Sequence, residues 1–229
     1  MIYTDPSGHW GTNVHFSATF AWATSFGFSE SAAYLIATVD NAVDRGNTSY
    51  LPFFGDQSRH FNMNDMAVSG SPGDTRSIHA ESCFQDAITA AKNGNLGGAL
   101  ALIGEGLHSL QDIDAHQDTY VHTLFGIKWH WLNSDADNIK VNANGYSDTT
   151  RDTASYFSRL IEVLKSLGID VSSIYSVPNS ASTNQIITST DQTNQSQTQQ
   201  SGGSASDNFY IPPNCSVYVD GQLLYEWQP

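Results

Sequence analysis

Two histidines and an aspartate recur at helical spacing in the stretch HSLQDIDAH, residues 108–116. His108, Asp112 and His116 are each four residues apart, so on a helix they lie on one face. Imidazole and carboxylate groups are the ligands that zinc takes in proteins. A solvated polar face can show the same spacing, so the pattern indicates metal chemistry only if further ligands exist elsewhere in the chain.

Further candidate ligands are spread over separate segments of the chain. The sequence has eight histidines, and His15, His60 and His130 stand beside aromatic or apolar residues. A metal cluster in a helical bundle draws one or two inward-facing ligands from each helix. The distribution therefore favours a site with several metal ions. The alternative is a non-catalytic structural module, whose histidines lie in the core, in solvent or in a closed zinc site.

The charge of the chain limits its partners. Nine basic residues stand against 23 acidic ones, which gives a net charge of −14. A nucleic-acid coat or a binder of anionic membranes would carry a basic patch instead. An enzyme that cleaves phosphodiesters is still allowed, because bound metal ions supply positive charge locally. No stable nucleic-acid partner is expected.

Neither a membrane anchor nor a cysteine framework is visible in the sequence. No run of about 18 apolar residues occurs, so no transmembrane segment is predicted. The first ten residues lack the basic start and apolar run of a signal peptide. Cys83 and Cys215 lie far apart, which predicts neither a disulfide framework nor a zinc site made of cysteines.

Apolar periodicity and turn residues predict an all-α fold built as a helical bundle. The predicted helices cover residues 11–26, 31–46, 74–94, 96–116 and 149–167. Gly27 is expected to end the first of them and Ser29 to cap the second. Residues 46–74 are predicted as a long loop around SRHFNMND. Residues 119–138 are aromatic and their pattern is ambiguous.

Composition divides the chain into four parts. Residues 1–9 form a leader, and residues 10–177 form the helical metal-binding domain. Residues 178–208 are polar and low in complexity, so they are predicted as a disordered linker. Residues 209–229 form a small extension in which Asp220-Gly221 signals a β-hairpin.

Several motifs together resemble one known superfamily. The stretch W-G-T-N-V-H begins at Trp10 and ends at His15, and His108 and Asp112 form an H-x-x-x-D motif. These motifs are similar to those of the superfamily that joins bacterial zinc-dependent phospholipases C with fungal single-strand-specific nucleases. The resemblance covers roughly residues 10–140 and implies an all-helical protein with two or three zinc ions.

The resemblance also implies a ligand set for each zinc. The first zinc is expected to be held by Asp44, His60, His108 and Asp112. The second is expected to be held by His116, His130 and Asp135. The third is expected to be held by His15, by the free amine and carbonyl of Trp10, and by Asp112 as a bridge.

Some of these assignments stay open at the sequence level. Asp40 lies one turn before Asp44 and is its rival, and His79 is a rival of His60. The family usually places a histidine six residues after the aspartate, whereas His116 follows Asp112 by four. Its final carboxylate would fall at position 134, which is serine, with Asp135 one residue further on.

The leader resembles a second known system. Asp5-Pro6-Ser7-Gly8 is similar to the motif that closes the core of Rhs-type polymorphic toxins, which cut themselves shortly after it. Cleavage between His9 and Trp10 would give Trp10 the free amine that a zinc site of this family needs. The resemblance implies a toxin that a bacterium secretes or delivers into a target cell, with an Rhs shell and a cognate immunity protein as partners.

The resulting functional hypothesis is a zinc-dependent phosphodiesterase. The favoured form is a phospholipase C that cleaves headgroups at a phospholipid membrane surface by metal-activated water, with catalytic roles for Asp44 and Asp112. The alternative on the same fold is a single-strand nuclease. Aromatic side chains fit either substrate, as contacts to lipid or as stacking partners for bases. They are Phe53, Phe54, Phe125, Trp129 and Trp131.

Overall fold

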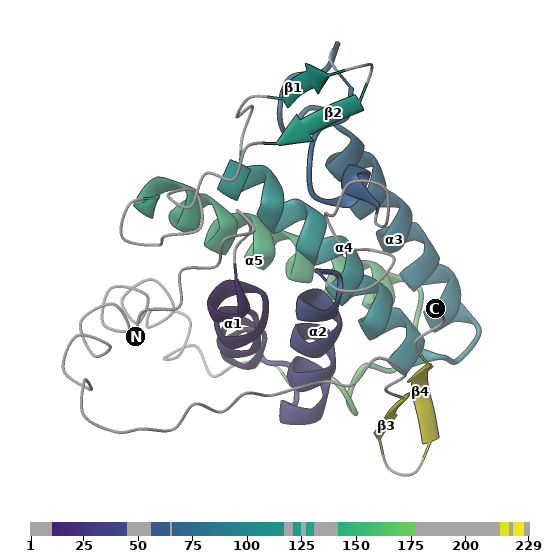
Figure 1. Cartoon of the computed structure of the whole chain (residues 1–229). Helices are drawn as coiled ribbons and strands as arrows, with labels where there is room; N and C mark the ends of the chain where they lie inside the picture. The colour runs from purple at the N-terminus through teal and green to yellow at the C-terminus, as the bar shows by residue number, and fades with distance from the viewer. Residues whose placement is uncertain are drawn as a thin grey trace, which may run out of the picture.

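The computed structural model describes residues 11–44, 56–64, 66–116 and 142–176, together with the backbone of four short strands. The described part is mostly helical, which confirms the predicted all-α class (Figure 1). Its helices are η1 (Asn13–Ala18), α1 (Thr19–Phe26), α2 (Glu30–Ala42), α3 (Thr75–Lys92), α4 (Leu96–His116) and α5 (Ala143–Ser166). A short 3-10 turn, η3 (Gln57–Arg59), precedes α3.

Parts of the predicted organisation lie outside the described residues. These are the leader at residues 1–9, Trp10, Asp135 and the linker at residues 178–208. The division of the chain into domains therefore stays a prediction.

Local side-chain chemistry sets the helix ends. The Ser29 hydroxyl accepts a hydrogen bond from the backbone N–H of Ala32 and so caps α2. Gly27 ends α1 with a φ of 113°, a left-handed conformation that glycine adopts without strain. Both features confirm the sequence prediction. The carboxylate of Asp74 caps α3 by accepting from the backbone N–H of Arg76.

The last helix starts earlier than its sequence predicts. The expected start near residue 149 is wrong, because α5 begins at Ala143. The Asn142 side chain caps this first turn by accepting from the N–H of Gly145. Asn, Gly and Ser in the first turns favour a loop in an isolated sequence. Here Gly145 is buried, and an added Cβ would lie 2.6 Å from the backbone oxygen of Asp114 on α4.

Two hairpins complete the described structure. The ambiguous aromatic segment contains β1 (Val121–Leu124) and β2 (Ile127–His130), which pair antiparallel with Val121 opposite His130. Near the end of the chain, β3 (Ser216–Val219) and β4 (Gln222–Glu226) pair antiparallel on either side of Asp220-Gly221. The second pairing confirms the predicted C-terminal hairpin.

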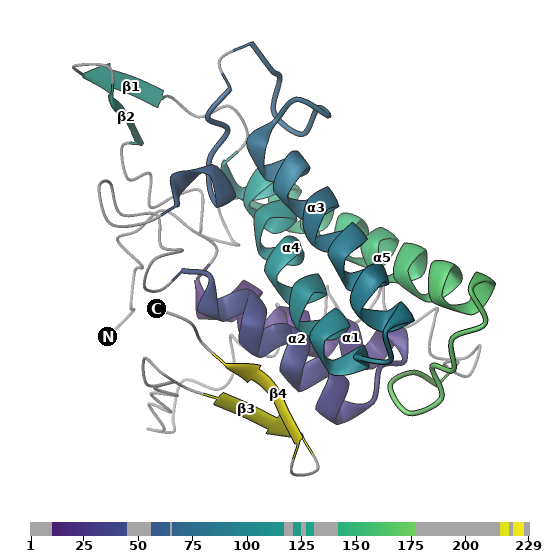
Figure 2. The ribbon, with the colours of Figure 1, turned by 90° about the vertical axis from the view of Figure 1, so that its right-hand side faces the viewer.

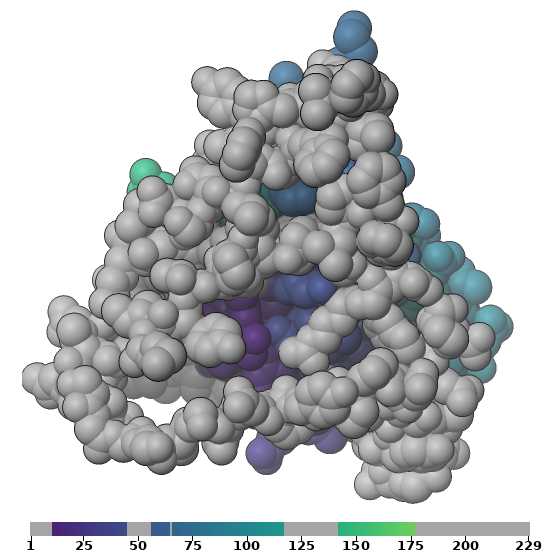
Figure 3. All heavy atoms as spheres, viewed as in Figure 1, coloured from purple at the N-terminus to yellow at the C-terminus, as the bar shows by residue number. Residues whose placement is uncertain are grey.

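Helix α4 is the centre of the bundle. It packs against α2, α3 and α5, and Figures 1 and 2 show these helices arranged around it. Its buried apolar side chains join those of its neighbours in one core, which includes Leu35, Ile36, Phe84, Ile103, Leu107, Phe157, Leu160 and Leu164. Atoms of the first two helices are visible at the centre of the face shown in Figure 3. Among the described helices, none is long and apolar enough to cross a membrane.

The contact between α2 and α4 depends on a glycine. A Cβ added to Gly104 would lie 2.5 Å from the backbone oxygen of Ile36 and 3.2 Å from the backbone nitrogen of Asp40. Backbone atoms cannot move aside as a flexible side chain can. Gly104 therefore lets α2 approach α4 closely, one turn before His108.

The variant Gly104→Ala should destabilise the fold by about 1–3 kcal/mol, because the added methyl group overpacks a backbone contact. Helix propensity alone predicts the opposite sign, since alanine stabilises a helix by about 1 kcal/mol relative to glycine. Urea unfolding followed by circular dichroism measures the difference. A variant as stable as the wild type, or more stable, would show that the helices can separate without cost.

Candidate metal centre

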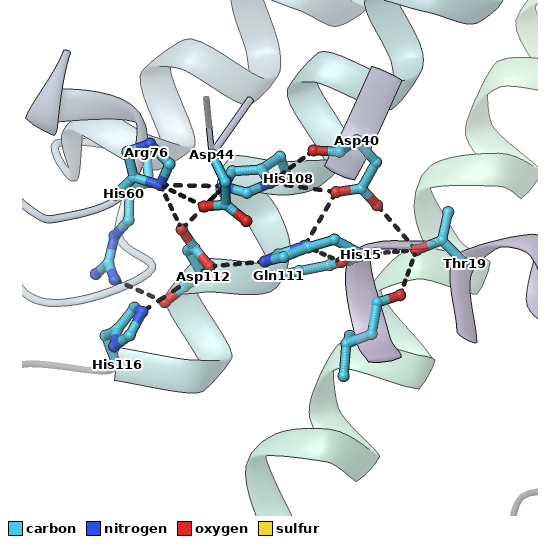
Figure 4. A network of polar contacts seen from close by, with 11 residues as sticks. His15, Thr19, Asp40, Asp44, His60, Arg76, His108, Gln111, Asp112 and His116 are labelled. Carbon is cyan, nitrogen blue, oxygen red and sulfur yellow. Dashed lines mark hydrogen bonds and ion pairs between the residues drawn. The ribbon is translucent and has the colours of Figure 1, made fainter. Parts of the chain in front are cut away.

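Side chains from four segments of the chain converge on one buried site (Figure 4). Their segments are η1, the C-terminal end of α2, the residue after η3, and one face of α4. His15, His60, His108 and Asp112 have no exposed surface, and Asp44 keeps 20% of its side chain exposed. His116, at the end of α4, is also buried. The face of α4 predicted from the spacing in HSLQDIDAH thus points into the protein.

Four of these side chains surround a common centre. His60 Nδ1 lies 3.0 Å from Asp112 Oδ2 and 3.8 Å from Asp44 Oδ1. His108 Nε2 lies 3.3 Å from Asp112 Oδ2, 3.5 Å from Asp44 Oδ1 and 3.0 Å from His60 Nδ1. A tetrahedral zinc ion with ligand bonds of about 2.0–2.1 Å separates its ligands by roughly 3.3–3.4 Å. The five measured separations lie around this value, so the donor set fits a metal ion.

The second oxygen of Asp112 faces different histidines. Asp112 Oδ1 lies 3.4 Å from His15 Nε2 and 3.9 Å from His116 Nε2. His15, His108 and Asp112 also form a group whose ligand atoms are close enough to hold an ion. Among the described residues, His15 Nε2 makes no hydrogen bond, although it is fully buried. The geometry therefore places Asp112 as a carboxylate shared between two adjacent positions.

A second layer of buried polar groups fixes the orientation of two histidines. His15 Nδ1–H lies within hydrogen-bond distance of Gln111 Oε1 at 2.8 Å and of Asp40 Oδ1 at 3.0 Å. His108 Nδ1–H donates to the backbone oxygen of Asp40 at 2.9 Å. Because the Nδ1 atoms donate outward, the Nε2 atoms of both rings are directed toward Asp112.

The outer acceptors are themselves held in place. Gln111 Nε2 donates to Thr19 Oγ1 at 2.9 Å, and Thr19 donates to Asp40 Oδ2 at 2.8 Å. Thr19 follows the π-helical turn η1, a wider turn that often occurs at functional sites. This layer resembles in its chemistry the outer hydrogen bonds that orient metal-binding histidines in general.

The buried carboxylates create a field that favours cations. Burial opposes protonation of His15, but the charge of Asp40 and the contacts with Asp112 outweigh it and raise its pKa well above the usual value. Burial and the charge of His15 lower the pKa of His108, yet Asp112 and Asp44 raise it to about 9. Burial raises the pKa of Asp112, and its histidine partners lower it well below the usual value. The same field would favour a metal dication in place of the histidine protons.

A buried ion pair supports α4 beside the site. The guanidinium of Arg76 lies 2.7 Å from Asp74 Oδ2 and donates to the backbone oxygen of Asp112 at 2.9 Å. Both side chains are fully buried. Burial opposes ionisation of Asp74, but the hydrogen bonds and charge of Arg76 outweigh it and lower the pKa of that carboxyl.

The structure separates the rival ligands that the sequence left open. Asp44 and Asp40 both belong to the site, Asp44 beside His60 and Asp40 behind the two imidazole rings. His79 belongs to another cluster, 3.4 Å from Glu105.

Three predicted ligands cannot be placed by their side chains. Trp10 and Asp135 lie outside the described residues, and His130 is described only by its backbone in β2. The predicted second and third ligand sets are therefore described only in part, by His116 and by His15 with Asp112.

Gln111, Thr19 and Arg76 were not among the predicted site residues. Amide, hydroxyl and guanidinium groups are poor or non-ligands, so no metal-binding pattern could mark them. Comparison of the chain with protein-family models, with curated proteins and with solved structures yields no significant match. The geometry of these side chains is what indicates a metal centre.

Replacing Asp40 with asparagine should weaken metal binding roughly 10–100-fold, as is common when the outer partner of a ligating histidine is lost. The amide removes the charge behind both imidazole rings but keeps the shape of the side chain. Isothermal titration of the metal-free protein with Zn²⁺ measures the effect. Thr38→Val is the matched control, because Thr38 is buried on the same helix and its hydroxyl makes no hydrogen bond within the described part of the chain. Equal affinities in both variants would contradict the orienting role.

Replacing Arg76 with methionine should destabilise the protein by about 3 kcal/mol or more, because it leaves the Asp74 carboxylate buried without its cation. The lowered pKa of Asp74 means that the pair stabilises the fold fully above the unfolded value of about 3.9 and loses this effect as the pH falls. The gap between variant and wild type should therefore shrink below about pH 4. Urea unfolding at a series of pH values tests both statements.

The matched control for this variant is Arg151→Met, since Arg151 is 66% exposed and pairs with Asp148 on the surface. A surface pair contributes little, so the control should unfold like the wild type. A pH-independent gap for Arg76→Met would contradict the role of the buried pair.

Proposed function

We propose that this chain is a metal-dependent phosphodiesterase with a zinc centre, and that it acts as a phospholipase C on membrane phospholipids. The observation that carries the proposal is the position of Asp112. Its two carboxylate oxygens face different histidines, and Asp44 completes the set on one side. A shared carboxylate is the arrangement expected where two metal ions act on one phosphate group.

Bound zinc would lower the pKa of a water molecule and neutralise charge on the phosphate oxygens. The protein fixes the positions of the ligand side chains. Asp112 is held from behind by Arg76, and His108 and His15 are oriented by Asp40. The carboxylates cannot bind a phosphodiester directly, because both groups are anionic hydrogen-bond acceptors, so bound metal would serve substrate binding as well as the reaction.

Asp44 is suited to contact the substrate side of the centre. Among the four side chains around the first position it is the one with exposed surface, 20%, whereas His60, His108 and Asp112 have none. Its carboxylate can accept a hydrogen bond from the attacking water and orient it toward phosphorus. Asp112 and Asp44 are therefore the residues to which we assign catalytic roles.

Two features favour lipid over nucleic acid as the substrate. The net charge of −14 opposes the approach of a polyanion, whereas it does not oppose a lipid surface that carries no net charge. In the loop that follows His60, Met66 and Val68 are 93% and 69% exposed. Apolar side chains at this exposure are suited to contact with the apolar part of a lipid surface. A single-strand nuclease remains the second candidate, because the W-G-x-x-x-H motif is that of the nuclease branch.

Delivery as a bacterial toxin rests on the resemblance of the leader to the end of an Rhs core. Under this proposal, self-cleavage before Trp10 would both release the domain and supply the free amine that completes the metal centre. Mass spectrometry of the released fragment tests this step, and a first residue other than Trp10 would contradict it.

The central prediction is that the protein binds zinc and releases a phosphate ester from phospholipid vesicles. Asp112→Asn should lower this activity by roughly 100-fold or more, because the amide has no negative charge and only one oxygen, so it cannot serve two metal positions. Zinc content by elemental analysis and release of soluble phosphate ester are measured together, on the full chain and on a chain starting at Trp10. The matched control is Asp148→Asn, which removes the same charge from the surface of α5.

The outcomes separate the candidate functions. Zinc with vesicle turnover that Asp112→Asn removes supports the phospholipase. Zinc without turnover of any lipid, but with cleavage of single-stranded DNA or RNA, supports the nuclease. Absence of bound metal in a correctly folded protein would overturn the enzyme proposal in favour of a structural module.

A further inference from the structure

A second cluster of metal-ligating side chains lies between α3 and α4. His79 and Cys83 are one turn apart on α3, and Glu105 faces them from α4. His79 Nε2 lies 3.5 Å from Cys83 Sγ and 3.4 Å from Glu105 Oε1. One ligand atom from each residue lies within 4.8 Å of the other two. The two separations from His79 match those between the ligands of one tetrahedral zinc ion, about 3.3–3.6 Å.

The cluster is distinct from the centre described above but close to it along the chain. Glu105 precedes His108 by one turn of α4. The guanidinium of Arg59 contacts Glu105 on one side and Asp56 on the other, and the residue after it is His60. None of the three clustered side chains contacts Asp112 in the described ion pairs.

We propose that His79, Cys83 and Glu105 form a separate binding site for a thiophilic metal dication such as Zn²⁺ or Cd²⁺. Thiolate, imidazole and carboxylate together make a donor set that zinc accepts, and the soft sulfur selects against Mg²⁺ and Ca²⁺. Three protein ligands leave a fourth position for water. His79 and Glu105 are each 20% exposed, so an ion can enter from solvent.

The charges of the cluster balance when the ion is bound. Asp56, Glu105 and the Cys83 thiolate supply three negative charges, and Arg59 with a dication supplies three positive charges. Without the ion, Cys83 is a protonated thiol, because burial and the nearby Glu105 raise its pKa to about 12. Metal binding must therefore release this proton, as is general for cysteine ligands.

A simpler interpretation is an ion-pair cluster that holds Arg59, and with it the turn that carries His60, against α4. Both interpretations are compatible with the contact between Arg59 and Glu105. They differ at Cys83, since an ion pair has no use for the sulfur, whereas a metal site needs it as a ligand. The experiment must therefore detect whether the Cys83 sulfur binds the metal.

The experiment is a titration of the full chain with Co²⁺ alone, followed in the near ultraviolet. A sulfur ligand gives an intense sulfur-to-cobalt charge-transfer band, whereas histidine and carboxylate ligands do not. The chain has two cysteines, so each can be replaced in turn. We expect the band in the wild type, its complete loss in Cys83→Ser, and its retention in Cys215→Ser.

Two further measurements keep the result independent of folding and of the proposed enzyme. Asp112→Asn should retain the band, because it damages only the other centre. In the unaltered protein, ¹¹³Cd NMR should show one resonance shifted by a single thiolate ligand, and His79→Gln should shift or abolish that resonance. No charge-transfer band in the wild type, or a band that survives in Cys83→Ser, would overturn this site and leave the proposed function untouched.

Discussion

The structure depends on a carboxylate that is fully buried and surrounded by imidazole rings. Removing the Asp112 carboxylate from water costs several kcal/mol, which only close cationic or metal partners can repay. Histidines on three different segments approach its two oxygens within 4 Å. The packing of η1, of the turn after η3 and of α4 is therefore tied to the charge at this point. A buried cluster of this kind is costly as a mere structural element, which is why its chemistry argues for a metal ion.

The apolar core and the polar centre are built by the same helix. One side of α4 carries Leu100, Ile103 and Leu107 into the core, and another carries His108 and Asp112 into the site. The close approach at Gly104 brings the end of α2 next to α4. Asp40 and Asp44 can therefore both contact the histidines, each in a different role. Asp44 then faces the imidazole nitrogens at the centre, whereas Asp40 holds the outer nitrogens. Their spacing of one helical turn is what allows both roles.

The sequence predicts the features that depend on local periodicity, namely the helices and the residues that share one helix face. The four-residue spacing of His108, Asp112 and His116 places them on one face in any helix, and the flanking leucines show which side is buried. Contacts between segments that are distant in the sequence could not be predicted from it. Gln111 and Thr19 enter the network only because η1 packs beside α4, and no spacing relates positions 92 residues apart. The cysteine count predicted no cysteine-rich zinc site, and it could not show that Cys83 faces a histidine and a glutamate.

The two clusters share one stripe of α4, and this has a thermodynamic consequence. Glu105, His108 and Asp112 follow one another at spacings of three and four, so successive turns of one helix face the two clusters. The short turn before α3 connects them again, because Arg59 binds at Glu105 and the next residue, His60, binds at Asp112. Both clusters therefore contact the same short turn. If an ion in one cluster changes the metal affinity of the other through this turn, the reverse effect is equal in size, because coupling between two binding equilibria is reciprocal.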